Sequence, residues 1–265
     1  MERKKVMEYS IVVPTYNEAD KISSTIVQIL SFMRDFSSSF EVIISDDGSV
    51  DNTVGIVESL IRDNIELKIV RNSHRGKGPT VWSGFMKASG ELIYLADADL
   101  SAPISEIKKL SVWANENDYD IVIASREGVG AERVNEPFHR HLMGRVFNLL
   151  VKLIALPGIQ DTQCGFKLFK RECAMDVFPR LSNLRDAKEV KKAYTGAWDV
   201  EVLLIAKKLG YKIKSVPVTW VYVKTTRVSP ITDSIKMALE VFLIKIRFLR
   251  GKYKSAQLTS ISPEK

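Results

Sequence analysis

The first half of the chain alternates short β-rich runs with stretches of helical period, and this alternation narrows the possible folds more than any other feature. The runs are YSIVVP, FEVIIS, LKIV, ELIYLA and DIVIA, which begin at residues 9, 40, 67, 91 and 120. Between the first two, Ile22, Ile26, Ile29 and Met33 recur at helical spacing. Near-continuous apolar strands separated by helices predict an α/β fold with a mostly parallel sheet covered by helices on both faces.

Polar residues follow four of these runs at the point where each strand is expected to end. PTYNE follows the first run, DDGS the second, DAD the fourth and SRE the fifth. The carboxyl ends of parallel strands meet at one edge of a sheet, and open α/β sheets bind ligands there. We therefore expect these polar residues to share one site.

Asp97 and Asp99 of the DAD motif lie two residues apart, so in an extended chain their carboxylates point the same way. Like charges held that close repel each other. Two interpretations remain open. The motif is either a capped turn or a site for Mg²⁺ or Mn²⁺ that ligand phosphates complete.

The other strand ends allow similar pairs of interpretations. Asp46 and Asp47 either hydrogen-bond a base or ribose or build a turn with Gly48. Lys77 lies between glycines after the third run, and either approaches a bound donor or is solvated. The dinucleotide pattern G-x-G-x-x-G is absent after the first run, and Arg71 occupies the first glycine position of a P-loop, so neither motif is present.

The net charge of +7, from 39 basic and 32 acidic residues, favours anionic partners. We do not expect nucleic acid to be one of them, because the charge is spread out and forms no basic strip with aromatic residues. Arg126 and Arg140 instead predict a pair that grips a smaller anion.

Two later segments are strongly apolar. Residues 141–158 are either core or an interfacial helix, and the sequence favours neither. Residues 234–254 place Ile235, Phe242 and Leu249 on one stripe with basic residues nearby, which is typical of a helix lying on an anionic membrane. No apolar run is long enough to span a bilayer, and no signal peptide is visible. We therefore expect a peripheral protein on the cytoplasmic face of a membrane, with one domain over residues 1–229 and a basic, membrane-associating tail over 230–265.

The motifs as a set resemble glycosyltransferase family 2, and in particular the dolichyl-phosphate sugar synthases. VVPTYNE, SDDGSVDNT, GKG, DADLSAP, SR and DTQCGFKLF occur in the family's order and at its spacings. DTQCGFKLF together with WDVEVLLIAKKLGY is most similar to the dolichyl-phosphate β-glucosyltransferase branch. The resemblance implies a GT-A fold, which is a Rossmann-like α/β sheet, with amphipathic helices at its C-terminal end.

The resemblance also implies roles for individual residues. The nucleotide would lie along Pro14, Thr15, Tyr16 and Glu18, with Asp47 on the base, and Asp97 and Asp99 would hold the metal ion. Arg126 and Arg140 match the arginines expected to hold the acceptor phosphate. The sequence departs from the mannose-phosphate relatives at Ser101, where they often carry glutamine, and at Gly144, where some carry a hydroxyl residue.

The reaction implied is an inverting transfer of glucose from UDP-glucose to dolichyl or another polyprenyl phosphate. A phosphate monoester has a second pKa of about 6 and is largely a dianion at neutral pH, so this acceptor needs no general base. Asp161 is expected in the site, and Asp199 and Glu201 are further candidates for a base or for sugar contacts. The charged segment 181–197 is a candidate lid.

Three other functions remain open on the sequence. The first is the same reaction with GDP-mannose as donor. The second is a soluble family 2 enzyme with a hydroxyl acceptor. The third is a non-catalytic module that binds nucleotide or lipid.

Overall fold

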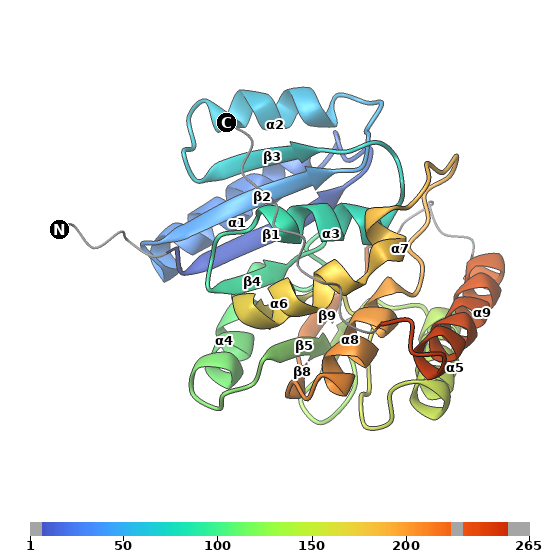
Figure 1. Cartoon of the computed structure of the whole chain (residues 1–265). Helices are drawn as coiled ribbons and strands as arrows, with labels where there is room; N and C mark the ends of the chain where they lie inside the picture. The colour runs from blue at the N-terminus through green and yellow to red at the C-terminus, as the bar shows by residue number, and fades with distance from the viewer. Residues whose placement is uncertain (1–6, 224–229, 254–265) are drawn as a thin grey trace.

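The computed structural model describes residues 7–223 and 230–253, and its centre is a seven-stranded sheet in the order β3-β2-β1-β4-β7-β5-β8 (Figure 1). The strands are β1 Tyr9–Thr15, β2 Phe40–Asp46, β3 Leu67–Arg71, β4 Leu92–Leu95, β5 Ile121–Ser125, β7 Lys167–Lys170 and β8 Ile213–Pro217. They run parallel except for β7, which is antiparallel to both β4 and β5. The predicted α/β fold with a mostly parallel sheet is confirmed.

Helices cover both faces of the sheet. The longer ones are α1 Ile22–Phe36, α2 Thr53–Ile61, α3 Lys77–Lys87, α4 Ile107–Asn115, α5 Phe138–Ile154, α8 Trp198–Lys208 and α9 Pro230–Leu249. The shorter ones are α6 Arg171–Val177 and α7 Ser182–Arg185, with 3₁₀ turns η1 Ile104–Glu106 and η2 Phe178–Arg180.

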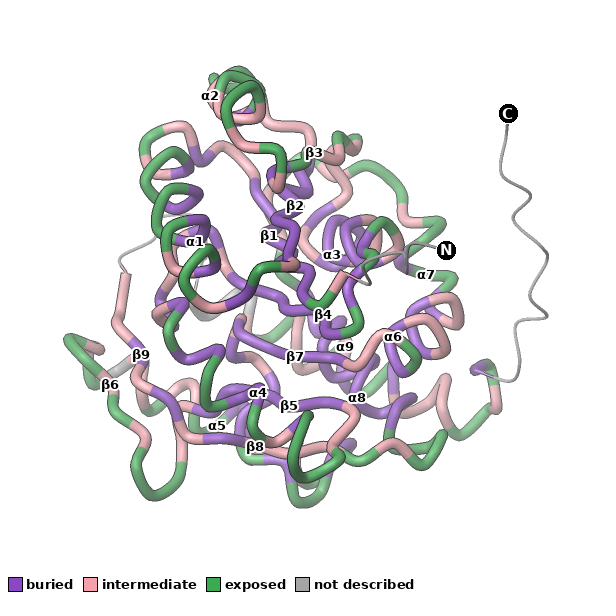
Figure 2. The backbone as a smooth tube through the Cα atoms, turned by 90° about the vertical axis from the view of Figure 1, so that its left-hand side faces the viewer, coloured by how far each residue is buried: buried purple, intermediate pink, exposed green. Residues whose placement is uncertain are grey.

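The alternation of side chains along β1 shows how the two core layers form. Ile11 and Val13 join the cluster that contains the buried residues of α1, α2 and α4. Val12 points to the other face and joins the cluster that contains those of α3, α5, α6, α8 and α9. Both faces of the sheet are therefore apolar, and Figure 2 shows that the central strands are buried. This is the reason that the strands read as continuous apolar runs.

The run from residue 211 to 223 is strand-like in sequence, but it does not form a single strand. It divides into β8 and β9 Thr219–Val221, which belong to different sheets. Pro217 is the last residue of β8, and its register partner in β5 is Ser125. Val218 then donates to Ser125 O (3.1 Å), and β9 pairs with β6 Glu132–Val134 in a separate two-stranded sheet.

The two apolar segments that the sequence singled out form α5 and α9, which pack against each other (Figure 1). Each has an inner and an outer apolar face. Val151 of α5 and Val241 of α9 are buried in the core. The outer faces expose Leu142, Val146, Leu149 and Leu153 of α5, and Ile235, Leu239, Phe242, Leu243 and Leu249 of α9. Segment 141–158 is thus both core and exposed surface.

The domain boundary at residue 229 stays a prediction. Residues 224–229 and 254–265 lie outside the described residues, and the second range is the last third of the expected basic tail. Within the described ranges, no helix combines the length and the apolar character needed to cross a membrane.

Candidate active site

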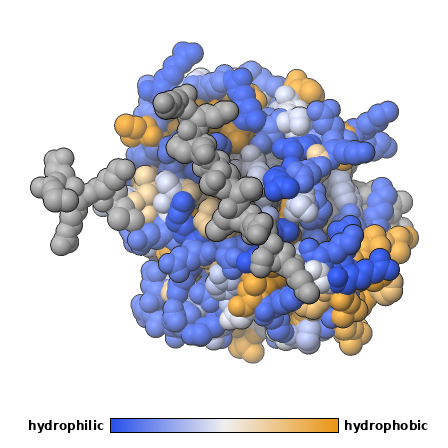
Figure 3. Space-filling model, viewed as in Figure 1, coloured by the Kyte–Doolittle hydropathy of each residue, from blue (hydrophilic) through white to orange (hydrophobic). Residues whose placement is uncertain are grey.

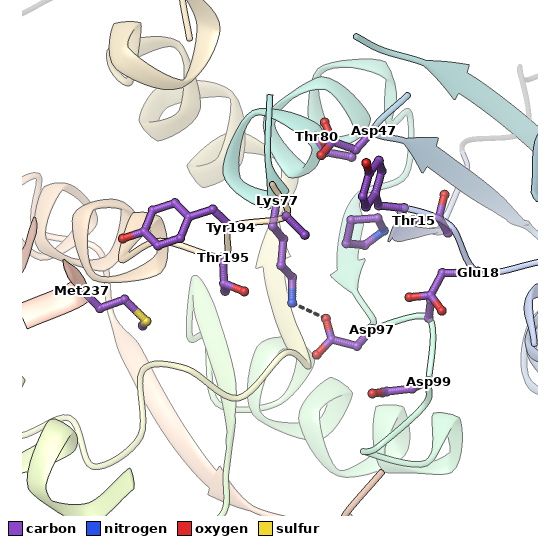
Figure 4. A pocket seen from close by; sticks show the side chains of 14 residues that line it. Thr15, Glu18, Asp47, Lys77, Thr80, Asp97, Asp99, Tyr194, Thr195 and Met237 are labelled. Atoms are coloured by element: carbon purple, nitrogen blue, oxygen red, sulfur yellow. Dashed lines mark hydrogen bonds and ion pairs between the residues drawn. The ribbon is translucent and has the colours of Figure 1, made fainter. Parts of the chain in front are cut away.

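A cavity of about 270 Å³ opens at the carboxyl edge of the sheet (Figure 4). Its walls come from the segments that follow β1, β2 and β4, from the start of α3, from residues 193–195 and from Met237 of α9. Among the residues expected in the site, it is lined by Pro14, Thr15, Tyr16, Glu18, Asp47, Lys77, Asp97 and Asp99. The predicted edge of the sheet therefore does bring these residues together.

Asp97 lies at the centre of the cavity and forms an ion pair with Lys77, whose Nζ is 2.5 Å from Oδ1 (Figure 4). Burial by itself raises the pKa of Asp97. The positive charges of Lys77, Lys167 and Arg126 outweigh burial, so the pKa of this carboxyl lies below its usual value. Asp97 is consequently an anion at neutral pH.

Gly165 packs directly against this carboxylate. A Cβ atom at residue 165 would lie 1.7 Å from Asp97 Oδ2, far inside van der Waals contact. Only glycine leaves room for the Asp97 side chain in this position, which gives the glycine of the DTQCGFKLF motif a physical role.

The donor atoms at Asp97 and Asp99 fit a hard divalent cation. Both residues line the cavity. One carboxylate oxygen of Asp99 accepts a hydrogen bond from Ser101 N (2.9 Å). Carboxylate oxygens are the ligands that Mg²⁺ and Mn²⁺ prefer, and such ions usually keep water and substrate phosphates as further ligands. Within residues 7–223 and 230–253, no group of three or more Asp, Glu, His or Cys side chains is placed to hold a metal ion alone.

Asp47 holds the loop that leads into α3. Its carboxylate accepts hydrogen bonds from Arg75 N (2.8 Å) and Gly76 N (3.0 Å), and it pairs with His74 Nδ1 (2.8 Å). The His74 ring also stacks on Tyr16, with ring centroids 4.0 Å apart. His74 thus links two residues that were expected to lie along the nucleotide.

Asp46 lies outside the cavity wall. Its carboxylate accepts from Ser49 N (2.8 Å) and Ser49 Oγ (2.5 Å) and from Thr15 Oγ1 (3.3 Å). Of the two interpretations of Asp46, these contacts match the turn.

Arg126, which is partly buried, forms an ion pair with the fully buried Asp161. Arg126 Nε donates to Asp161 Oδ2 (2.8 Å) and Nη2 donates to Oδ1 (2.9 Å), while Arg126 N also donates to Oδ2 (3.0 Å). Burial raises the pKa of Asp161, but the charge and hydrogen bonds of Arg126 outweigh this and lower it to about 2. Asp161 is thus a fixed anion that orients Arg126.

The two arginines lie over neighbouring aromatic rings. The Arg126 guanidinium lies 5.3 Å from the ring centroid of Trp220, and that of Arg140 lies 5.0 Å from the ring of Tyr222. The two rings are 6.2 Å apart. The structure therefore places Arg126 and Arg140 over two neighbouring rings, although neither arginine lines the 270 Å³ cavity.

Asp199 and Glu201 lie at the start of α8, outside that cavity. The pKa of Asp199 is raised by burial, which the nearby charge of Lys167 only partly offsets. Glu201 accepts hydrogen bonds from Asn183 Nδ2 (2.8 Å) and from Tyr253 OH. The contacts of Glu201 join α8 to the end of the described chain.

The segment 181–197 covers the loop at the start of α3. Its residues Ala193, Tyr194 and Thr195 line the cavity, and Lys77 N donates to Tyr194 O (3.2 Å). Glu240 of α9 accepts a hydrogen bond from Ala197 N (2.8 Å). Its role as a lid stays a prediction.

Several residues of this site carry no sequence signal of their own. His74, Gly165 and Glu240 are far in sequence from the groups that they contact. The spacing of DTQCGFKLF indicated the segment that contains Gly165. Nothing in the local pattern indicated His74 or Glu240.

Comparison with known proteins agrees with these features. The model of the family described as glycosyl transferase family 2 matches residues 10–178. The chain belongs to glycosyltransferase family 2. This family member is 34% identical over 259 residues to a dolichyl-phosphate beta-glucosyltransferase of Dictyostelium discoideum, covering 92% of this chain and 76% of that protein. It is 31% identical over 266 residues to the human protein of the same name, covering 94% of this chain and 78% of that one.

Solved structures share the fold at lower identity. Mannosyl-3-phosphoglycerate synthase from Rubrobacter xylanophilus aligns with a TM-score of 0.66 at 18% identity, over 96% of this chain and 77% of that one. Glucosyl-3-phosphoglycerate synthase from Mycobacterium tuberculosis, crystallised with Mn²⁺, UDP and phosphoglyceric acid, aligns with a TM-score of 0.63 at 17% identity, over 95% and 80% of the two chains. The expected glycosyltransferase fold is confirmed.

Proposed function

We propose that this family 2 glycosyltransferase moves glucose from UDP-glucose to dolichyl or another polyprenyl phosphate and forms a β-linked product. The observation that carries the proposal is the position of an arginine pair beside a carboxylate-lined cavity, at the end of the molecule where α5 and α9 expose apolar side chains. A donor diphosphate, an acceptor phosphate and a lipid chain match these three features. The similarity to dolichyl-phosphate beta-glucosyltransferases supports glucose as the sugar.

In this proposal the nucleotide lies along Pro14, Thr15, Tyr16 and Glu18, with its base near Asp47. Asp97 and Asp99 would hold Mg²⁺ or Mn²⁺, which when bound would neutralise charge on the departing diphosphate. Lys77 adds a positive charge beside Asp97.

Arg126 and Arg140 would hold the acceptor phosphate. Asp161 accepts hydrogen bonds from Nε and Nη2 of Arg126. No described residue accepts a hydrogen bond from Nη1 of Arg126. Because a guanidinium carries five N–H donors, Arg126 keeps donors for a phosphate. The acceptor is already a dianion at neutral pH, so these residues have to position two anionic groups rather than remove a proton. Asp161, with a pKa of about 2, is a poor base, which favours a phosphate over a hydroxyl acceptor.

Contact with the membrane would be peripheral, through the outer faces of α5 and α9, on the cytoplasmic side. Exposed apolar residues on both helices support this contact. Burying such a face in the interfacial region of a bilayer is favourable.

The deciding experiment is sugar transfer to a polyprenyl phosphate, measured separately with labelled UDP-glucose and GDP-mannose. We expect glucose transfer that chelation of divalent ions abolishes and Mg²⁺ or Mn²⁺ restores. Mannose transfer without glucose transfer would refute the choice of donor, and transfer only to a hydroxyl acceptor would refute the choice of acceptor.

A binding measurement addresses the residues of the site. We expect Asp99→Asn to weaken the metal-dependent binding of UDP by at least tenfold, whereas Asp35→Asn on the exposed side of α1 should not change it. Normal metal-dependent binding by Asp99→Asn would exclude Asp99 from the metal site. If wild type bound UDP and metal but transferred no sugar to any acceptor, the chain would be a binding module.

A further inference from the structure

A second cavity, a groove of about 440 Å³, runs along α5 away from the donor cavity. It is lined by Glu127, Gly128, Arg145, Val146, Asn148, Leu149, Lys152 and Gln160. None of these residues has a part in the site described above. The groove begins immediately after Arg126 in the chain, so it adjoins the proposed acceptor site without sharing its residues.

Five residues of α5 line this groove, and four of them share one side of the helix. Arg145, Asn148, Leu149 and Lys152 stand at positions i, i+3, i+4 and i+7, which lie on one side of a helix. Two cations therefore flank an amide and an apolar side chain along a single face.

The groove carries uncompensated positive charge. No carboxylate among the described residues forms an ion pair with Arg145 or Lys152. The groove's own acid, Glu127, is paired with Arg133 at 2.8 Å. An anion that entered the groove would meet two unpaired cations.

Asn148 adds a hydrogen-bond donor that has no partner. The residue is only 7% exposed, and its Nδ2 is buried without an acceptor among the residues that the structure describes. A buried donor left unsatisfied costs free energy, so a ligand oxygen in the groove would be favoured at this position.

The surface next to the cations is apolar. Leu142, Val146, Leu149 and Leu153 are 52–78% exposed on the adjoining side of α5. Figure 3 shows hydrophobic residues gathered at the lower right of the molecule, over the region of α5 and α9. A free phosphate ion would use only the cations and the amide, whereas a lipid would also cover these leucine and valine side chains.

We propose that this groove binds the phosphate headgroup of an anionic membrane lipid that is distinct from the polyprenyl phosphate acceptor. Arg145, Lys152 and Asn148 Nδ2 hold the phosphate oxygens, and the acyl chains pass over Val146 and Leu149. The bound lipid fixes α5 in the membrane surface and thereby holds Arg126 at the level of the headgroups. The inference rests on the membrane contact proposed above, but it does not depend on the sugar or the acceptor.

The test is co-sedimentation of the full chain with phosphatidylcholine vesicles, with and without phosphatidic acid. An interfacial cation contributes about 1 kcal/mol near an anionic surface, so Arg145→Gln/Lys152→Gln should bind the acidic vesicles about 30-fold more weakly. Binding to vesicles of phosphatidylcholine alone should not change. Asn148→Leu, which keeps the volume and both cations, should weaken binding to acidic vesicles about fivefold.

The matched control is Arg62→Gln/Lys87→Gln, which removes the same charge from exposed positions at the ends of α2 and α3. Equal losses in the control and the groove variant would mean general electrostatic attraction and would overturn the proposal. So would a parallel loss of sugar transfer to a short, water-soluble polyprenyl phosphate, because the groove would then belong to the acceptor site. If wild type bound acidic vesicles selectively but transferred no sugar to the soluble acceptor, the proposed function would be refuted. The proposal that the groove binds an anionic lipid would be retained.

Discussion

Asp161→Asn tests whether the buried pair with Arg126 supports the fold as well as the site. Asp161 is 0% exposed, and its carboxylate meets Arg126 through two side-chain hydrogen bonds of 2.8 and 2.9 Å. The pKa of this carboxyl falls from 3.8 to about 2 in the folded protein, which corresponds to about 2 kcal/mol of folding free energy. Removal of the charge also leaves the partly buried guanidinium of Arg126 without its counter-ion, so we expect a loss of about 3 kcal/mol at neutral pH.

The pH dependence follows from the sign of the shift. A carboxyl whose pKa is lower in the folded state stabilises the protein above its unfolded pKa and loses this contribution as the pH falls through the folded value. The stability difference between wild type and Asp161→Asn should therefore be full above about pH 4 and shrink between about pH 4 and pH 2. Urea unfolding at a series of pH values measures both quantities.

The matched control is Asp118→Asn. Asp118 also contacts two cations, Lys170 and Lys212, but its side chain is 75% exposed. Solvent screens such pairs, so its replacement should leave the unfolding midpoint almost unchanged. The reasoning is refuted if Asp161→Asn is as stable as wild type at neutral pH, or if its deficit stays constant down to pH 2.

Three further predictions concern the cavity. Gly165→Ala forces the Asp97 carboxylate away from its position and should slow sugar transfer about 100-fold with an unchanged circular dichroism spectrum; near-normal transfer would show that the clash at 1.7 Å is relieved without moving Asp97. Glu240→Ala leaves Ala197 N without its acceptor and should weaken UDP binding about fivefold, whereas Glu240→Gln keeps an oxygen there and should bind as wild type does. Equal UDP affinities of Glu240→Ala and wild type in calorimetry would show that this hydrogen bond does not support UDP binding. His74→Ala removes a ring stacked on Tyr16 and should also weaken UDP binding about fivefold, since such stacking contributes about 1 kcal/mol; unchanged or tighter binding would mean that the imidazole does not support the nucleotide site.

The sheet was predictable from the sequence because its strands are buried on both faces. Their apolar runs are continuous, and polar residues begin where the strands leave the core, as Thr15 and Asp46 show at the ends of β1 and β2. Strand β7 gave no such signal. It has four residues, two of them lysines. Burial of Lys167 is possible because its amine donates a hydrogen bond to Cys164 O (2.5 Å) and lies near the Asp199 carboxylate. Such pairing depends on tertiary contacts that local composition does not contain.

The candidate site was predictable to the extent that its residues lie directly after strands. Asp97 and Asp99 follow β4 closely, Lys77 begins the helix that follows β3, and the cavity contains all three. The groups that hold them come from distant parts of the chain, for example Gly165 at Asp97 and Glu240 at the segment beside Lys77. Periodicity reports which face of an element is buried, but it does not report which distant residue lies against that face.

The antiparallel strand β7 has a consequence for how enzymes of this shape can diversify. Because β5 ends at Ser125 and its neighbour β7 begins at Lys167, residues 126–166 are the connection of an enlarged hairpin whose two ends are pinned side by side in the sheet. That connection carries Arg126, Arg140, α5 and Asp161, whereas the walls of the donor cavity come largely from strands β1, β2 and β4. The connection therefore contains the residues proposed to hold the acceptor, and the walls of the donor cavity lie outside it. We expect a chimera that replaces only residues 127–160 to change the preferred acceptor while keeping nucleotide binding.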